Sequence, residues 1–184
     1  MHADFESFLS IIVPEYQKTT AGLTQHQQQA LSMPTLSIAV QPPRETQVGQ
    51  IIYPPVIGNL VCRRPHERYY FFAMVVLLGV DGTVIDGGFA GTTVSTGTPL
   101  AGADSSRHSV VFVFPDISIS YEGTYKIRMD VYKVAYEDPD KATLNTQVET
   151  RSISIVSEEV ARKRPSDREH EFMRSLRHAG IPIP

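Results

Sequence analysis

Few residues of this 184-residue chain are spaced as a catalytic site requires. The stretch Gly87-Gly88-Phe89-Ala90-Gly91 is rich in glycine, but no Lys-Ser or Lys-Thr pair follows it, as a phosphate-binding loop needs. Neither a G-x-S-x-G nucleophile elbow nor the H-E-x-x-H pair of a zinc hydrolase occurs. We therefore expect a protein that is not an enzyme and that needs no cofactor.

Histidine and cysteine give equally little support for a metal site or a nucleophile. His170 and His178 have a spacing that could place them on one helical face, but no third ligand is evident. A solvated polar helix face is the favoured interpretation. The single cysteine, Cys62, cannot form an internal disulfide, and we expect it to be a small buried hydrophobic residue.

The charges of the chain gather in short clusters. The formal net charge is −3, whereas a duplex-DNA-binding domain usually has a basic excess, so a nucleic-acid surface here must be a local patch. The cationic clusters lie in the loop 63–68 and at 162–164. One cysteine, no apparent signal peptide and no apolar run of bilayer length lead us to expect a soluble intracellular protein.

The strongest structural pattern runs from residue 110 to residue 134. Residues 110–114 are continuously apolar, and residues 125–134 alternate between apolar and polar, which is typical of a half-buried strand. Gly123, between them, suits a tight corner with positive φ. Tyr125 beside this corner is similar to the tyrosine corner of immunoglobulin-like sandwiches, although a plain turn and strand is the alternative.

The rest of the folded part also reads as strands and turns. Residues 69–80 are the most apolar, which predicts a central strand buried on both faces, and Asp81-Gly82 predicts a hairpin after it. Residues 137–141 read as a polar insertion, and residues 147–156 as the last strand. About seven short strands predict an all-β, antiparallel, immunoglobulin-like sandwich.

Both ends of the chain depart from this pattern. Residues 1–33 read as an N-terminal extension, with a short helix at 5–12 and a Gln-rich linker, before a folded domain at 34–184. Ser166 and Glu169 have the spacing of a capping box, and an apolar stripe follows them. We therefore expect a C-terminal helix over 167–179 that packs on the sandwich.

Three separated segments carry a family likeness. The first is Gln41-Pro42-Pro43-Arg44 followed by Tyr53-Pro54-Pro55-Val56, and the second is F-x-F-P-D-x-S…E-G-x-Y over residues 112–125. The third is Arg164-Pro165-Ser166 with the helix that follows and Ala179-Gly180-Ile181. In this order and spacing, over roughly residues 36–183, they resemble the velvet domain of fungal regulators.

The resemblance implies a sandwich similar to the Rel-type transcription-factor domain. It also implies a nuclear protein, with the cytoplasm as a second location, that binds duplex DNA and forms homodimers or heterodimers with other velvet-domain proteins. Velvet proteins govern development, sporulation and secondary metabolism, and some assemble with a nuclear methyltransferase-like partner. No membrane association is implied.

One departure from the family pattern concerns the DNA contact. The family has a longer loop rich in Lys and Arg after the Q-P-x-R segment, whereas residues 45–52 here contain neither, so only Arg44 matches. Phosphate contacts supply much of the affinity of non-specific DNA binding. Other cations must compensate, with solvated loop charges as the alternative for each. The candidates are Arg63, Arg64 and Arg68, and Arg162, Lys163 and Arg164, of which the last three also suit a nuclear localisation signal.

Two functional hypotheses remain open from the sequence. The first is a dimeric velvet regulator that binds DNA through an arginine-rich edge. The second is a velvet-like interaction module with little DNA affinity of its own, which the acidic balance and the loop without Lys or Arg favour. Tyr53, Pro54 and Pro55 are candidates for the pairing surface, because a stiff segment loses little entropy on binding. A structural bend is the alternative for these residues.

Overall fold

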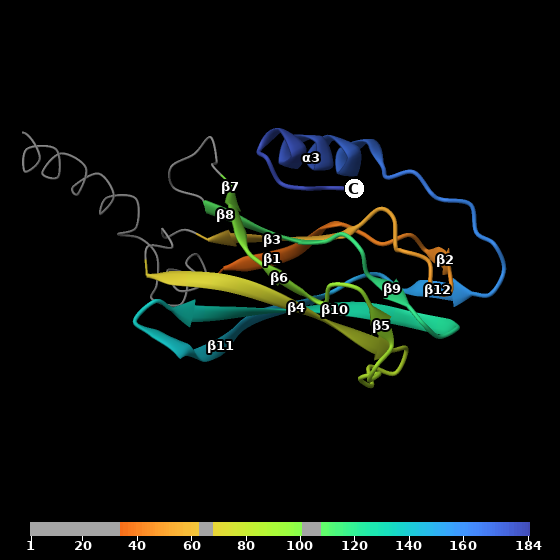
Figure 1. Cartoon of the computed structure of the whole chain (residues 1–184), viewed down its shortest axis with the longest axis horizontal. Helices are drawn as coiled ribbons and strands as arrows, with labels where there is room; N and C mark the ends of the chain where they lie inside the picture. The colour runs from red at the N-terminus through yellow and green to blue at the C-terminus, as the bar shows by residue number, and fades with distance from the viewer. Residues whose placement is uncertain (1–33, 63–67, 101–107) are drawn as a thin grey trace, which may run out of the picture. The chain divides into compact units, whose positions relative to one another are not determined.

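The computed structural model describes residues 34–62, 68–100 and 108–184. The helix and linker expected within residues 1–33, together with Arg63 and Arg64, lie outside these ranges. The described part is a sandwich of two sheets with a helix on the outer side of one of them (Figure 1). The expected all-β, immunoglobulin-like sandwich with a C-terminal helix is therefore confirmed.

The first sheet, which we call sheet A, has four antiparallel strands. Its central pair reads VIGNLVC and HSVVFVF, which are apolar on both faces, as strands covered on both sides should be. In spatial order the strands are β1 (Thr35–Val40), β3 (Val56–Cys62), β8 (His108–Phe114) and β7 (Thr98–Leu100).

The second sheet, sheet B, is built around the long strand β10. One parallel pair, β2 with β12, interrupts its otherwise antiparallel arrangement. The second half of β10 pairs with β11 on the edge that β12 occupies along the first half. In spatial order the strands are β2 (Glu45–Gln47), β12 (Ile153–Val156), β10 (Gly123–Ala135), β4 (Tyr69–Gly79) and β6 (Val94–Thr96), with β11 at Asp138–Glu149. A small separate ribbon joins β5 (Phe89–Ala90) and β9 (Ser118–Ile119).

The main core lies between the two sheets. Phe112 and Phe114 of β8 meet Ile127 and Met129 of β10 there, and all four are fully buried. The corner before β10 has the geometry expected from the sequence, because Gly123 has φ of 144° and the Tyr125 hydroxyl donates to the Glu122 carbonyl over 2.9 Å. The tyrosine-corner interpretation is therefore confirmed for Tyr125.

A second, smaller core lies between sheet A and the helix α3 (Asp167–His178). Met173 and Leu176 of α3 pack on Ile57 and Val111, which project from the outer face of sheet A. The capping box predicted for the helix start is present, with the side chain of Ser166 and that of Glu169 each satisfying the other's backbone amide. The helix thus begins where the sequence indicates and ends within one residue of the expected position.

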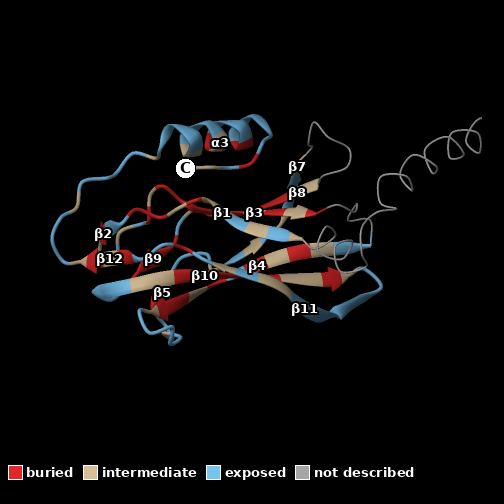
Figure 2. Ribbon diagram, turned by 180° about the vertical axis from the view of Figure 1, so that it is seen from behind, coloured by how far each residue is buried: buried red, intermediate tan, exposed pale blue. Residues whose placement is uncertain are grey.

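Two strand predictions were wrong. β4 is buried along one face over 71–77, whereas on the face away from sheet A its residues are half-buried or exposed except for Leu78, which is 2% exposed (Figure 2). The polar insertion expected at 137–141 is instead the start of β11, which ends at Glu149 before β12 begins at Ile153. An edge strand is mostly exposed and needs no apolar pattern, which is why the sequence does not reveal it.

The hairpin predicted at Asp81-Gly82 is present. Gly82 has φ of 83°, and the amide of Gly79 donates to the carbonyl of Thr83 over 2.8 Å. The returning arm of this hairpin pairs with β4 through a single bridge between Leu78 and Val84.

Candidate functional site

Two segments that carry cations approach each other at one end of sheet B. The parallel pairing of β2 with β12 places Arg44 beside Ser154, whose amide donates to the Arg44 carbonyl over 2.8 Å. After β12 the chain continues towards α3, and this connecting segment carries Arg162, Lys163 and Arg164. We call Arg44, Arg162, Lys163 and Arg164 the basic rim.

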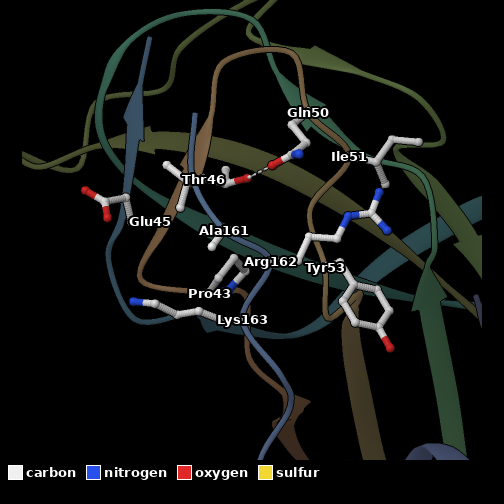
Figure 3. Close-up of a pocket in the computed structure, with 10 residues that line it drawn as sticks. Pro43, Glu45, Thr46, Gln50, Ile51, Tyr53, Ala161, Arg162 and Lys163 are labelled. Atoms are coloured by element: carbon white, nitrogen blue, oxygen red, sulfur yellow. Dashed lines mark hydrogen bonds between the residues drawn. The ribbon is translucent and has the colours of Figure 1, made fainter. Parts of the chain in front are cut away.

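Two cations of the basic rim, Arg162 and Lys163, line a shallow depression beside the segment of Arg44, and Arg44 and Arg164 are not among its lining residues. Pro43 and Glu45, the neighbours of Arg44, line it together with Arg162 and Lys163. Figure 3 shows the side chain of Arg162 beside Tyr53, with Lys163 extending on the side of the depression where Glu45 lies. The enclosed volume of about 10 Å³ is at the lower limit for one water molecule, so the feature is a surface and not a small-molecule site.

Two charged residues outside the basic rim hold the segment that carries Arg44. The guanidinium of Arg151 donates to the Pro42 carbonyl over 2.8 and 3.1 Å, and its backbone amide donates to the side chain of Gln41. From the other side, a carboxylate oxygen of Glu169 accepts the Gln41 amide over 3.0 Å. Sheet B and the first turn of α3 are thereby joined through one short segment.

Glu169 is ionised more readily than a free glutamate. Burial raises its pKa, but hydrogen bonds from Ser166 and Gln41 outweigh this effect, so the pKa lies below its usual value. The negative charge that these amides require is therefore present at neutral pH. It also suits the first turn of a helix, where the macrodipole favours an anion.

The cations of the basic rim are available to an anion. Arg44, Arg162, Lys163 and Arg164 are all exposed. Among the described residues, the ion pairs are Lys126 with Glu149 and Arg128 with Asp130, and neither involves the rim. Exposed cations without a carboxylate partner can exchange bound counterions for phosphates at little desolvation cost.

Not every predicted cation belongs to the rim. Arg68 precedes β4, and its carbonyl accepts the amide of Tyr136, just beyond the last residue of β10. The rim lies at the first residues of β10, where Gly123 pairs with Ile155. At about 3.3 Å per residue, the length of β10 separates the two places by roughly 40 Å.

The Tyr53-Pro54-Pro55 segment forms a bend with a cis Tyr53–Pro54 peptide bond. Pro54 and Pro55 are buried and Tyr53 is half-buried. A pairing role for this segment stays a prediction, and only Tyr53 presents part of its side chain for such a contact.

The remaining candidate groups take no part in the rim. Cys62 is buried, and loss of hydration raises the pKa of its thiol to about 11, so the thiol is not a nucleophile at neutral pH. His170 and His178 are exposed on α3. Over residues 34–62, 68–100 and 108–184, no group of three His, Cys, Asp or Glu side chains is placed to hold a metal ion. The same residues include no helix with the length and hydrophobicity of a membrane span.

Sequence reasoning missed the two residues that position the rim. Glu169 is identifiable as a capping residue, but its bond to Gln41 joins residues 128 positions apart. Arg151 stands in no motif and contacts Pro42 only because β12 lies beside β2. Nothing in the sequence signals either contact, since each depends on the pairing of distant strands.

Comparison with known proteins identifies relatives of this chain. Two curated relatives share the description "Developmental and secondary metabolism regulator veA". The one from Chaetomium globosum is 39% identical over 51 residues, which are 26% of this chain and 9% of the relative. The one from Pyricularia oryzae is 35% identical over 65 residues, 34% of this chain and 10% of the relative. The matched region thus spans about a tenth of the length of these relatives.

Among solved structures, the CARDB domain of a Pyrococcus furiosus protein aligns with a TM-score of 0.36 and 14% identity, covering 67% of this chain and 90% of that domain. The sequence profile described as "Velvet factor" matches residues 15–163. This match covers most of the chain, including the corner at Gly123 and both parts of the basic rim up to Lys163, and it shows that the chain belongs to the velvet family.

Proposed function

We propose that this chain is a velvet-type regulator of fungal development, sporulation and secondary metabolism, and that it binds duplex DNA through the basic rim. The observation that carries the DNA contact is that Arg162 and Lys163 line one depression beside the segment that carries Arg44. These residues are exposed and outside the described ion pairs. The regulatory role follows the description of the veA relatives.

The basic rim compensates in part for the absence of Lys and Arg from the loop at 45–52. Its cations come from two segments more than a hundred residues apart, and the bonds of Arg151 and Glu169 to residues 41 and 42 fix one of these segments. Contacts of this kind go to phosphates, so they provide affinity without reading sequence. We expect a nuclear protein that acts as a dimer with a second velvet domain, and a nuclear methyltransferase-like protein is a further candidate partner.

A salt-dependent binding titration tests the DNA contact. The variant Arg162→Ala/Lys163→Ala/Arg164→Ala should bind duplex DNA more weakly, and its slope of log affinity against log salt should fall by about 3. Arg68→Ala is a control, because it removes an exposed cation at the opposite end of β10. It should leave the slope unchanged. If Arg68→Ala lost more DNA affinity than the triple variant, the DNA interface would lie at the end of β10 where Arg68 is.

The second candidate function is an interaction module that pairs with another velvet protein and contributes little DNA affinity. The absence of Lys and Arg from residues 45–52 favours it, as does the presence of Glu45 at the depression. If the wild-type protein shows no salt-dependent DNA binding near physiological ionic strength, the result would favour this function over the first.

A further inference from the structure

One serine of the chain directly follows the basic rim. Ser166 has Arg164, Lys163 and Arg162 at two, three and four positions before it. No other serine or threonine of the 184 residues has Lys or Arg at both the second and the third position before it. Charge pattern is one feature by which protein kinases select substrates, and cations at these positions suit a kinase with an acidic substrate groove. The sequence before Ser166 is therefore that of a kinase substrate.

The segment that precedes Ser166 can enter such a groove. Residues 158–165 belong to no helix or strand, and none of them forms a hydrogen bond with another described residue. Residues 161–166 are exposed except for Pro165, which is half-buried. Backbone with so few internal bonds separates from the rest of the fold at low free-energy cost. A kinase can thus bind this segment in an extended form while the sandwich stays folded.

The hydroxyl of Ser166 is also part of the contact that joins α3 to the segment of Arg44. It donates to one carboxylate oxygen of Glu169 over 2.7 Å, and the Ser166 amide donates to the same oxygen over 2.9 Å. The other carboxylate oxygen of Glu169 accepts the amide of Gln41 over 3.0 Å. A chemical change at the hydroxyl therefore acts on Gln41 through a single carboxylate.

Phosphorylation would replace this hydroxyl donor with an anion. The Ser166 oxygen forms a bond to the γ-phosphorus of ATP, and the bond from that phosphorus to the β,γ-bridging oxygen breaks. ADP leaves with the electron pair, and the hydroxyl proton passes to a base of the kinase. The phosphoryl group has a charge of about −1.5 to −2 at neutral pH, so it repels the Glu169 carboxylate. Once Glu169 turns away, Gln41 loses its acceptor.

The phosphoryl group would also act on the cations of the basic rim. Arg164 lies two residues before Ser166, and Arg162 and Lys163 precede it in the same exposed segment. An added charge of about −2 offsets two of these three cations. We propose that Ser166 is a phosphorylation site which a kinase recognises through the preceding cations, and that its phosphoryl group switches off the basic rim. The effect on DNA rests on the proposed function, whereas the modification itself does not.

Incubation of the full chain with Mg-ATP and the catalytic subunit of cAMP-dependent protein kinase tests the site. We expect tandem mass spectrometry to locate a phosphoryl group on Ser166. Lys163→Ala/Arg164→Ala should lower the rate of phosphorylation about tenfold or more, because the cations pair with the kinase groove. Ser157→Ala removes another exposed serine just before the same segment and should leave the rate unchanged. A native chain without phosphate on Ser166, or a double variant that is modified as fast as wild type, would overturn the site.

Two measurements on the phosphorylated chain test the switch. Hydrogen exchange at the Gln41 amide should become about tenfold faster, since the amide loses its acceptor. The slope of log affinity for duplex DNA against log salt should fall by about 2. Ser166→Asn keeps a capping side chain but has no hydroxyl, so treatment with the kinase should change neither quantity.

Unchanged Gln41 exchange together with an unchanged slope would overturn the switch. The outcome is separable from that of the DNA contact. If the unmodified chain binds no DNA, the proposed function fails, while the exchange rate at Gln41 still decides whether phosphorylation releases the segment of Arg44.

Discussion

The outer faces of the two sheets differ in what covers their apolar residues. On sheet A, Ile57 and Val111 are at most 1% exposed, because Met173 and Leu176 of α3 lie on them. On sheet B, several apolar side chains of the outer face are exposed to a large extent. We call three of them, which strand pairing places on that face, the open face: Met74, Val94 and Leu144. The helix α3 thus covers and stabilises the outer face of sheet A, whereas the outer face of sheet B stays accessible. This difference teaches that the two outer faces of one sandwich contribute unequally to its stability.

The largest effect should come from breaking the covered face. Leu176→Ala removes a fully buried side chain between α3 and sheet A, and we expect it to lower the free energy of unfolding by about 3 kcal/mol. Met74→Ala removes a similar volume from the open face and should cost less than about 1 kcal/mol. Urea denaturation of both variants, at concentrations where the chain is monomeric, measures the contrast. Equal losses would show that the open face is covered within one chain.

A smaller loss of stability is expected when the bond between helix α3 and the segment that carries Arg44 is removed. Glu169→Ala removes the reciprocal half of the capping box and the acceptor for the Gln41 amide, which should cost about 1 kcal/mol. Glu171→Ala, on the exposed side of the same helix, is the control and should be nearly neutral. The unfolding midpoints of the two variants, compared with wild type, provide the test, and equal shifts would contradict the assigned role of Glu169.

The pH dependence of that contribution has a defined sign. Because the pKa of Glu169 is lowered in the folded state, its ionised form stabilises the fold above the ordinary glutamate pKa of about 4.3. This stabilisation is lost as the pH falls through the lowered folded value. The difference in unfolding free energy between wild type and Glu169→Gln should therefore be constant above about pH 5 and shrink as the pH falls further. Thermal unfolding at a series of pH values measures it, and a difference that stays constant below about pH 5 would refute the assignment.

The smallest effect on stability should come from the open face itself. Val94→Glu is expected to change the unfolding free energy of the monomer by no more than about 0.5 kcal/mol, because the side chain is 46% exposed. A large loss of monomer stability would mean that Val94 packs inside one chain, which would remove the contrast between the two faces.

The parts of the fold with a regular local pattern were predictable from the sequence. The alternation in β10, the corner at Gly123 and the capping box of α3 each depend on residues close together in the chain, and each was confirmed. β11 was not predictable, because an exposed edge strand carries polar residues such as Asp140 and Lys141 as readily as a loop does. The open face was hidden for a related reason, since the continuous apolar run of β4 reads the same whether one face is buried or both are.

The candidate site was predictable as residue types but not as an arrangement. Arg44 and the cluster 162–164 are visible in the sequence as cations, yet only the folded chain brings the neighbours of Arg44, Pro43 and Glu45, to the depression that Arg162 and Lys163 line. The same sequence reasoning grouped Arg68 with them, and the structure places it at the far end of β10. Short-range sequence patterns specify strands and turns. Whether distant cations lie near each other depends on the order of the strands in the sheet, which the sequence pattern does not determine.

The place of α3 in the chain bears on how the protein is made. All of the described strands precede α3 in the sequence, so they leave the ribosome before the helix does. Until then, Ile57 and Val111 on the outer face of sheet A have no cover from Met173 and Leu176. Apolar surface that is exposed during synthesis makes incomplete chains prone to aggregate and is one reason why chaperones exist. A nascent chain that stalls before Asp167 should therefore depend on a chaperone more than the chain that has completed the helix.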